Sequence, residues 1–508
     1  MSRARTLIIL GSACIAMLTA TWFASAQFPE PHRAKLGQPL EAPSSGVILV
    51  SAQQMPDPKS LIPTIPISLP AALQLANVNP IDIQLAQQRV AFAAAQLQRA
   101  ELLWLPTIYL GVDYYRHDGQ LQDVTGNVFG TSKDAFMIGA APTAVFATTE
   151  AIFAPLAARQ DVRAQNAALQ ATRNDSLLAV AETYFNVQQA RGEIAGAEAT
   201  LRDAEELVRR ADKLAPGLVP PVEAIRARTE MAKRKQVVSS ARERWRVASA
   251  DLCRLLRLDA ATPVEPVEPP FLQVDLVRLD TPVEELIAVG LTNRPELAQQ
   301  QALVQATLQR LRQEKFRPLL PSVVLRGAST NPAGTLAGGY FGGGVNDNMS
   351  NFQARGDFDV QVLWELQNLG FGNHARVKEK QAEHELANYE LLRVQDLVAA
   401  EVVQSFTKAQ EAHGRVKEAE IGLKLAAESV QKNFEGLSQT KRLGADVVIL
   451  VIRPQEVIAA IQALAQAHSD YYTAVGDYDR AQFRLYRALG QPAQMMLGHD
   501  ASPLGLCK

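Results

Sequence analysis

The chain has 508 residues, of which 47% are hydrophobic and 6% aromatic, enough apolar material for two or more ordinary domains. Its 51 basic and 53 acidic residues give a formal net charge of −2, which gives no reason to expect a nucleic acid or an acidic surface as partner. Alanine, glutamine, leucine and valine dominate the middle of the chain, a mixture that favours long helices packed through small side chains.

The first 26 residues are typical of a secretory signal peptide. Two arginines precede an apolar run, and Ala24-Ser25-Ala26 supplies the small residues of a cleavage site. A lipoprotein signal using Cys14 is the alternative, which Gly11 disfavours because a bulky aliphatic residue is expected there. After the signal, no stretch approaches the roughly 20 apolar residues of a membrane-spanning helix, so any entry into a bilayer would use strands.

Proline positions divide the rest of the chain into linkers and long helices. Prolines crowd the leader at 27–66 and a linker at 263–281, and they are absent from long reaches elsewhere. Because an interior proline costs a helix about 3 kcal/mol, the reaches with helical apolar spacing predict long helices. In the first hairpin, a long helix should run over 156–214 and a second helix should return over 222–258. In the second hairpin, the returning helix should run over 452–489 after a turn near Gly444.

Two short motifs that recur later in the chain indicate that this organisation occurs twice. Asn79-Pro80 and Leu105-Pro106 have counterparts in Arg294-Pro295 and Leu320-Pro321, each 215 residues later. We therefore predict two repeats, each a helix, two strands and a long antiparallel helical hairpin. The expected domains are a signal peptide (1–26), a Pro-rich leader (27–66), a first repeat (67–262), a Pro-rich linker (263–281), a second repeat (282–490) and a C-terminal tail (491–508).

Four strands are expected in the whole chain, two in each repeat. They should lie at the end of each hairpin that is opposite its turn. The clearest is 352–366, where apolar and polar residues alternate over a length that suits a lipid-facing barrel strand with a watery lumen. Its companions are 107–116, 136–146 and 322–330, and the glycines at 338–344 predict a loop. The residues expected to face lipid are Phe358, Val360, Val362 and Trp364.

Four strands are too few to enclose a lumen, and a bilayer tolerates a sheet only when no edge stays unpaired. Several copies must then share one barrel. Three copies would give twelve strands, although this argument alone does not select three.

With this repeat in view, the sequence resembles the TolC family of outer membrane efflux proteins from about Ser68 to Leu489. The segments that carry the resemblance are 69–76 leading to Asn79-Pro80, the Leu-Pro ends of both helices, Asn293-Arg-Pro-Glu-Leu297 and the strand-to-helix junction at 364–373. The resemblance implies a mainly α fold, in which long antiparallel helical hairpins form a periplasmic tunnel. It also implies four strands per protomer in a shared twelve-stranded trimeric barrel in the outer membrane.

The resemblance also implies partners and sites. The homotrimer would serve an efflux or type I secretion system as a passive conduit without a cofactor, joined through a periplasmic adaptor to an inner membrane transporter. Glu223 keeps the acid of the family's tip motif, whereas Leu450 replaces it in the second repeat, so an acidic cation-binding ring is not expected. The expected adaptor contacts are Gly217, Leu218, Arg442, Leu443 and Gly444, and the candidate gate residues are Glu223, Arg226, Leu450 and Arg453.

Other classes of function have less support. A soluble periplasmic coiled-coil scaffold without transport activity is the main alternative, and a periplasmic hydrolase has no nucleophile or metal motif behind it. The chain is therefore not expected to be an enzyme. Arg228, Lys235 and Arg242 form a basic stripe on one predicted helix, which favours a solvated face over a contact with an adaptor or a cell-wall polymer.

Overall fold

A computed structural model of the chain gives the architecture. The residues that it describes are 64–78, 80–105, 107–214, 220–326, 339–342, 353–355, 359–443 and 447–490.

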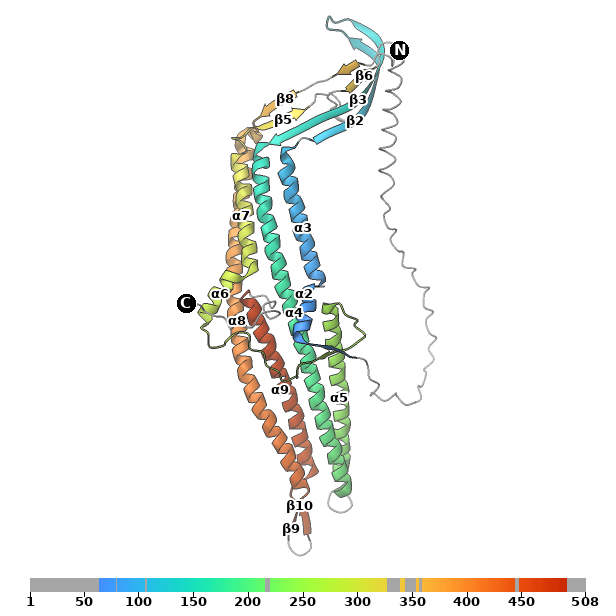
Figure 1. Cartoon of the computed structure of the whole chain (residues 1–508), viewed down its shortest axis with the longest axis vertical. Coiled ribbons are helices and arrows are strands. Elements are labelled where there is room, and N and C mark those ends of the chain that lie inside the picture. The colour runs from blue at the N-terminus through green and yellow to red at the C-terminus, as the bar shows by residue number, and fades with distance from the viewer. Residues whose placement is uncertain are drawn as a thin grey trace, which may run out of the picture. The chain divides into compact units, whose positions relative to one another are not determined.

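The described residues form two repeats of the same kind, with strands at one end of the helices and hairpin tips at the other (Figure 1). The first repeat contains α2 (Leu69–Val78), α3 (Ile81–Glu101), the short η1 (Leu102–Trp104), β2 (Thr107–Gln122), β3 (Val128–Ala147), α4 (Thr148–Leu214) and α5 (Pro221–Leu256). The second contains α6 (Val283–Asn293), α7 (Pro295–Phe316), β5 (Ser322–Arg326), β6 (Gly339–Gly342), β7 (Gln353–Arg355), β8 (Asp359–Leu363), η2 (Gln367–Gly370), α8 (Phe371–Leu437) and α9 (Pro454–Ala488).

Two helices, α4 and α8, run the length of their repeats. Each has 67 residues, about 100 Å at 1.5 Å per residue. The helix α4 begins eight residues earlier than predicted and contains Pro155, so the absence of proline was too strict a criterion for its start. The predicted mainly α fold with long antiparallel hairpins is confirmed. None of the described helices contains a stretch long and apolar enough to cross a bilayer.

The main sheet is antiparallel, and β3 pairs with β2 along sixteen residues. On its other side β3 pairs with both β5 and β6, and these pair in turn with β8 and β7. Twelve residues separate Arg326 from Gly339, whereas only three separate their partners on β3 and three those on the β7–β8 side. The chain between β5 and β6 is therefore nine residues longer than the stretch that separates their partners on either side. Of the strand predicted over 322–330, residues 322–326 form β5, and 327–330 lie outside the described residues.

Three further predictions about the sheet need correction. Gly339 and Gly342 are paired strand residues of β6 and not part of a loop, because the strand position resumes after the extra residues. The strand predicted over 352–366 ends at Leu363, so Trp364 lies beyond β8. The first strand pair is longer than predicted, since β2 continues to Gln122 and turns through an Asp123 side chain that accepts hydrogen bonds from Thr125 and Asn127.

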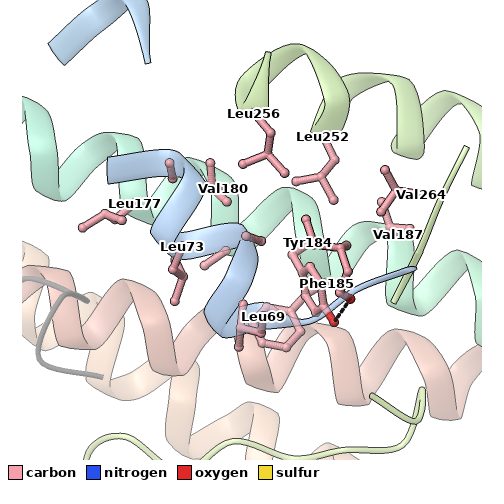
Figure 2. Packing of buried hydrophobic residues seen from close by; sticks show 14 of the residues in the cluster. Leu69, Leu73, Leu177, Val180, Tyr184, Phe185, Val187, Leu252, Leu256 and Val264 are labelled. Carbon is pink, nitrogen blue, oxygen red and sulfur yellow. Dashed lines mark hydrogen bonds between the residues drawn. The ribbon is translucent and has the colours of Figure 1, made fainter. Parts of the chain in front are cut away.

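The apolar core lies near the middle of the helices and contains residues of α2, α4 and α5. Leu73 of α2, Tyr184 and Phe185 of α4 and Leu252 of α5 are almost fully buried there (Figure 2). Two short strands border this core, β1 (Ile65–Ile67) and β4 (Val264–Pro266), which pair in parallel. The predicted Pro-rich linker is thus an ordered element of the core region.

Candidate functional site at the hairpin tips

The second tip has a structure that the sequence did not predict. A two-stranded antiparallel ribbon, β9 (Thr440–Leu443) and β10 (Val447–Leu450), lies between α8 and α9 where a simple glycine turn was expected. Arg442 and Leu443 belong to β9, and Leu450 ends β10. The consecutive β-branched residues Val447, Val448 and Ile449 were the available signal, since β-branched residues favour strands. The predicted contact residues Gly217, Leu218 and Gly444 lie outside the described residues.

Two candidate gate residues come together where α5 meets α9. Arg226 Nη1 donates to Glu223 Oε1 at 2.6 Å and to Gln455 Oε1 of α9 at 3.3 Å. The other carboxylate oxygen of Glu223 is buried and has no hydrogen-bond partner among the described residues. A glutamate at this position usually accepts the N–H of the residue before the helix. Here that residue is Pro220, which has none.

One turn further from the tip, a second polar contact joins the same two helices. Glu230 is 3% exposed, and its Oε1 lies 2.6 Å from Nη2 of Arg234. Its Oε2 accepts a hydrogen bond of 2.8 Å from Nε2 of Gln462 on α9. Both carboxylate oxygens are satisfied, so the buried charge is compensated. The hairpins are thus held together here by side-chain bonds and by a small apolar cluster.

That apolar cluster explains the place of Leu450. The partly buried Leu450 packs against a cluster formed by α4, α5, α8 and α9, with Leu207 and Ile461 at its centre. Arg453 is exposed in the extended residue before α9 and makes no side-chain cap. The structure therefore brings Glu223 and Arg226 together, places Leu450 against the apolar cluster, and leaves Arg453 at the surface.

Between α4 and α8, near the tips, lies an open pocket of about 600 Å³. Arg210 of α4 reaches across it and donates to the carbonyl oxygen of Phe434 at 3.0 Å and to Ser438 Oγ at 3.1 Å. Its guanidinium carbon lies 5.0 Å from the centroid of the Phe434 ring, a cation–π arrangement. Sequence reasoning missed this contact, because the two residues are far apart in the chain.

At the opposite end, the strand residues expected to face lipid have an exposed face. Val360 and Val362 are 52% and 49% exposed, whereas Asp359 and Gln361 on the other face of β8 are less exposed. Trp364, just beyond the strand, is 60% exposed. Phe358 lies outside the described residues.

A strap formed by residues 264–279 fastens both repeats at mid-height, and sequence reasoning missed it. Tyr184 of α4 donates to Glu268, and Tyr478 of α9 donates to Asp275. Four residues after each tyrosine stands a glutamine, and Gln188 and Gln482 bind the strap backbone. The repeated Tyr-x-x-x-Gln spacing is visible in the sequence, but its partners are not.

Next to Tyr478, Asp479 fastens the strap through a buried carboxylate. Its Oδ1 accepts the N–H of Val274 at 2.8 Å, and the residue is 1% exposed. Burial raises the pKa of the Asp479 carboxyl to about 7, with nearby Asp275 adding to the shift, while the Val274 hydrogen bond and Arg480 oppose it. A fixed negative charge is therefore disfavoured at this position.

Arg294 of the second repeat is the centre of a buried ionic network. Its side chain is 4% exposed and binds Glu296 at 3.0 Å, Glu401 at 2.8 Å and the carbonyl of Ala488. Arg487 of α9 binds the same two carboxylates. The network ties α7, α8 and α9 together, which gives the Asn-Arg-Pro anchor a structural role. Among the described residues no group of three or more His, Cys, Asp or Glu side chains is placed to hold a metal ion.

Comparisons with known proteins agree with this architecture. The profile of the family described as outer membrane efflux protein matches residues 72–256. The resemblance to the outer membrane efflux proteins is confirmed. The proteins that it resembles are channels, which supports a channel role in efflux and agrees with the expectation that the chain is not an enzyme. None of the curated proteins matches the chain.

Solved structures of outer membrane channels share the fold. The CmeC channel of Campylobacter jejuni superposes with a TM-score of 0.67 at 15% identity, covering 83% of this chain and 85% of that one. VceC of Vibrio cholerae gives a TM-score of 0.65 at 15% identity over 83% of this chain and 96% of its own. The open state of MtrE from Neisseria gonorrhoeae gives 0.65 at 15% identity, over 84% and 89%. At 83–84% coverage of this chain, these structural matches extend beyond the range of the family profile.

Proposed function

We propose that the chain is an outer membrane channel subunit of a tripartite efflux or type I secretion system. In this proposal it is a homotrimer, with four strand positions from each chain completing a twelve-stranded barrel and the helical hairpins forming a periplasmic tunnel. The fold that it shares with outer membrane channels over 83% of its length carries the proposal.

The sheet supports the shared barrel. Within the described residues, β2 pairs only with β3, and β8 pairs only with β5, so each outer strand has one unpaired edge. A bilayer requires every backbone group to be paired. A neighbouring copy that pairs β2 with β8 would satisfy both edges, and Val360 and Val362 would then contact lipid.

The tips are the proposed point of contact with a periplasmic adaptor, which links the channel to an inner membrane transporter. Glu223, Arg226, Leu450 and Arg453 are the proposed gate residues. The bonds from Arg226 to Gln455 and from Gln462 to Glu230 join the hairpins with groups that water can replace. Separation of the tips would therefore need no covalent change, and the substrate would pass through unaltered.

Fractionation of the full-length protein expressed in a double-membraned bacterium tests this function. The proposal expects a detergent-requiring oligomer in the outer membrane whose electrophoretic mobility changes on heating. Purified trimers should also give large, stable conductance steps in planar bilayers. A monomer recovered from the periplasm without detergent would instead favour the soluble scaffold and reject the channel.

A further inference from the structure

Two glycines of α4 allow side chains of α9 to lie directly on the α4 backbone. A Cβ added to Gly192 would collide with the ring of Tyr472, and one added to Gly196 would lie 2.8 Å from Cβ of His468. The two glycines are one helical turn apart on α4, and the two rings are one turn apart on α9. Together Gly192, Gly196, His468 and Tyr472 form one contact between the two repeats, the glycine seat.

On the side of the seat that is nearer the sheet, polar side chains join α4 and α9, which lie side by side (Figure 1). Arg480 of α9 donates to Asn186 at 2.8 Å and to Gln189 at 2.9 Å. Further arginines of α9 bind acids of α4 in the pairs Arg484–Glu182 and Arg487–Asp175. These directional bonds fasten this part of α9 to α4.

On the side of the seat that is nearer the tips, the contact between α4 and α9 is apolar. Leu207 and Ala211 of α4 pack with Val457 and Ile461 of α9. Between residues 197–214 of α4 and 454–467 of α9, all of them described, no hydrogen bond or ion pair joins the two helices. Apolar contacts have no preferred direction. The glycine seat is therefore the boundary between a fastened and a separable part of this contact.

His468 is the member of the seat whose charge can change near neutral pH. Its Nδ1 is buried without a hydrogen-bond partner among the described residues. A Cβ added to Gly196 would lie 3.3 Å from that nitrogen, so this side of the ring lies against α4. The ring stacks on Tyr472 with 6.2 Å between the centroids. Because both nitrogens of a protonated imidazole are donors, protonation places a charged N–H where no acceptor lies.

The charged groups on the neighbouring helices at this height are bound to one another. They form the pairs Glu193–Arg244, Glu198–Arg242 and Glu420–Lys424, which involve α4, α5 and α8. On α9 itself, Asp470 lies on the far side of the helix from His468 and accepts a hydrogen bond of 2.7 Å from Gln466. Burial raises the pKa values of Tyr471 and Tyr472, so both tyrosines stay neutral.

Two further titratable groups face the same helices from a greater distance. Asp203 is seven residues from Gly196 along α4, about two turns nearer the tips. His413 of α8 contacts the ring of Tyr478, which is ten residues from His468 along α9. Burial accounts for the lowered pKa of His468, and among the described residues no neighbouring charge offsets it.

We propose that the glycine seat is a pH-sensitive joint, at which protonation of His468 displaces its ring from Gly196 and lets the tip-side part of α9 move away from α4. The inference rests on the proposed channel and gives its tips a regulation. Acidification on the periplasmic side favours separation of the hairpins.

The sign and size of the response follow from linkage. Burial holds the pKa of His468 below its usual 6.5, so the seat is strongest with a neutral ring and weakens as the pH falls below about 6.5. Each pKa unit between the seated and the released ring changes the ratio of released to seated chains by about tenfold. The change is complete once the pH lies below the pKa of the seated ring.

Pulsed electron paramagnetic resonance tests the joint within one chain. In full-length protein with Cys253→Ala and Cys507→Ser, spin labels are placed at Arg209→Cys on α4 and Ala459→Cys on α9, two exposed positions on the tip side of the seat. Dilution with unlabelled protein isolates the pair within one chain. Lowering the pH from 7.5 to 5 should add a population with a longer distance between the labels. An unchanged distance distribution would overturn the joint.

Two histidine variants separate this joint from other groups that titrate in the same range, such as Asp479. His468→Phe keeps a ring in the seat without a titratable group and should abolish the pH response. His413→Phe is the matched control, because His413 also has a buried Nδ1 without a partner among the described residues but lies inside one hairpin. It should keep the response. Equal responses of the two variants would refute the assignment to His468.

Gly196→Ala gives an independent readout, because the added methyl group occupies the place of the His468 ring. The longer distance should then appear already at pH 7.5. In planar bilayers, the natural chain should open more often at pH 5 than at pH 7.5. If conductance steps occur while the label distance does not depend on pH, the joint is wrong and the channel assignment stands. If the distance responds but neither conductance nor an outer membrane oligomer is found, the joint stands and the channel assignment fails.

Discussion

Replacing Asp479 by asparagine should remove a pH-dependent weakness of the strap. The carboxyl is 1% exposed and accepts the Val274 N–H through an oxygen that asparagine also provides. Its pKa rises from 3.8 to about 7 in the folded chain because burial disfavours the charged form. The substitution keeps the hydrogen bond and the size of the side chain while abolishing the titration.

The sign and size of the effect follow from linkage. A pKa raised on folding means that the stabilising contribution of Asp479 is complete below about pH 4 and is lost as the pH rises to about 7. At about 1.36 kcal/mol per pKa unit, the full loss is about 4 kcal/mol. Between pH 5.5 and pH 8, the free energy of unfolding of the asparagine variant should gain about 2 kcal/mol over that of the natural chain.

Urea unfolding of the purified protein in detergent, followed by far-ultraviolet circular dichroism at both pH values, measures this difference. Taking the difference between two variants cancels the titration of all other groups. Asp470→Asn, on the exposed side of the same helix, is the matched control for the loss of a carboxylate, and its effect on stability at pH 8 should be smaller than that of Asp479→Asn. A stability difference for Asp479→Asn that is equal at pH 5.5 and pH 8 would refute the reasoning.

Three further predictions concern the gate, the ionic network and the sheet. Arg226→Ala should make cells more permeable to large antibiotics, because the bond to Gln455 is lost, whereas Arg228→Ala, whose partner is Asp212 of the same hairpin, should not; equal permeability would remove Arg226 from the gate. Arg294→Met should cost about 1–3 kcal/mol in urea unfolding, because Glu296 and Glu401 each lose one of two arginine partners and the Ala488 carbonyl loses a charged donor, and an unchanged stability would contradict the role of the network. Val360→Glu should abolish outer membrane trimers by placing a charge against lipid, and normal trimer yield would disprove the assigned face.

The sequence was sufficient to predict the long helices. The helical spacing of apolar residues and the positions of prolines located α5 and α9 to within two residues at each end. A helix interior disfavours proline, and apolar residues recur along the sequence wherever one face of the helix is buried. The same criterion misplaced the start of α4, where Pro155 is tolerated inside the helix. Local patterns therefore fixed the periodic elements but not all their ends.

What the sequence could not predict depends on contacts between distant residues. The strap was interpreted as a linker because its prolines exclude regular structure, and nothing local shows that Tyr184 and Tyr478 bind its acids. The Arg210 contact to Phe434 was missed for the same reason. The extra residues between β5 and β6 became evident only from the register of their neighbours.

Both halves of the chain bind the strap, so separating the halves would break contacts that hold it. If the chain were cut after α5, the first half would lose the acceptor of Tyr184, and the second would carry a loose end from which Tyr478 and Asp479 hold only a part. Coexpressed halves should therefore reassemble poorly unless the strap stays whole, and a permuted chain should open at a tip in preference to this junction.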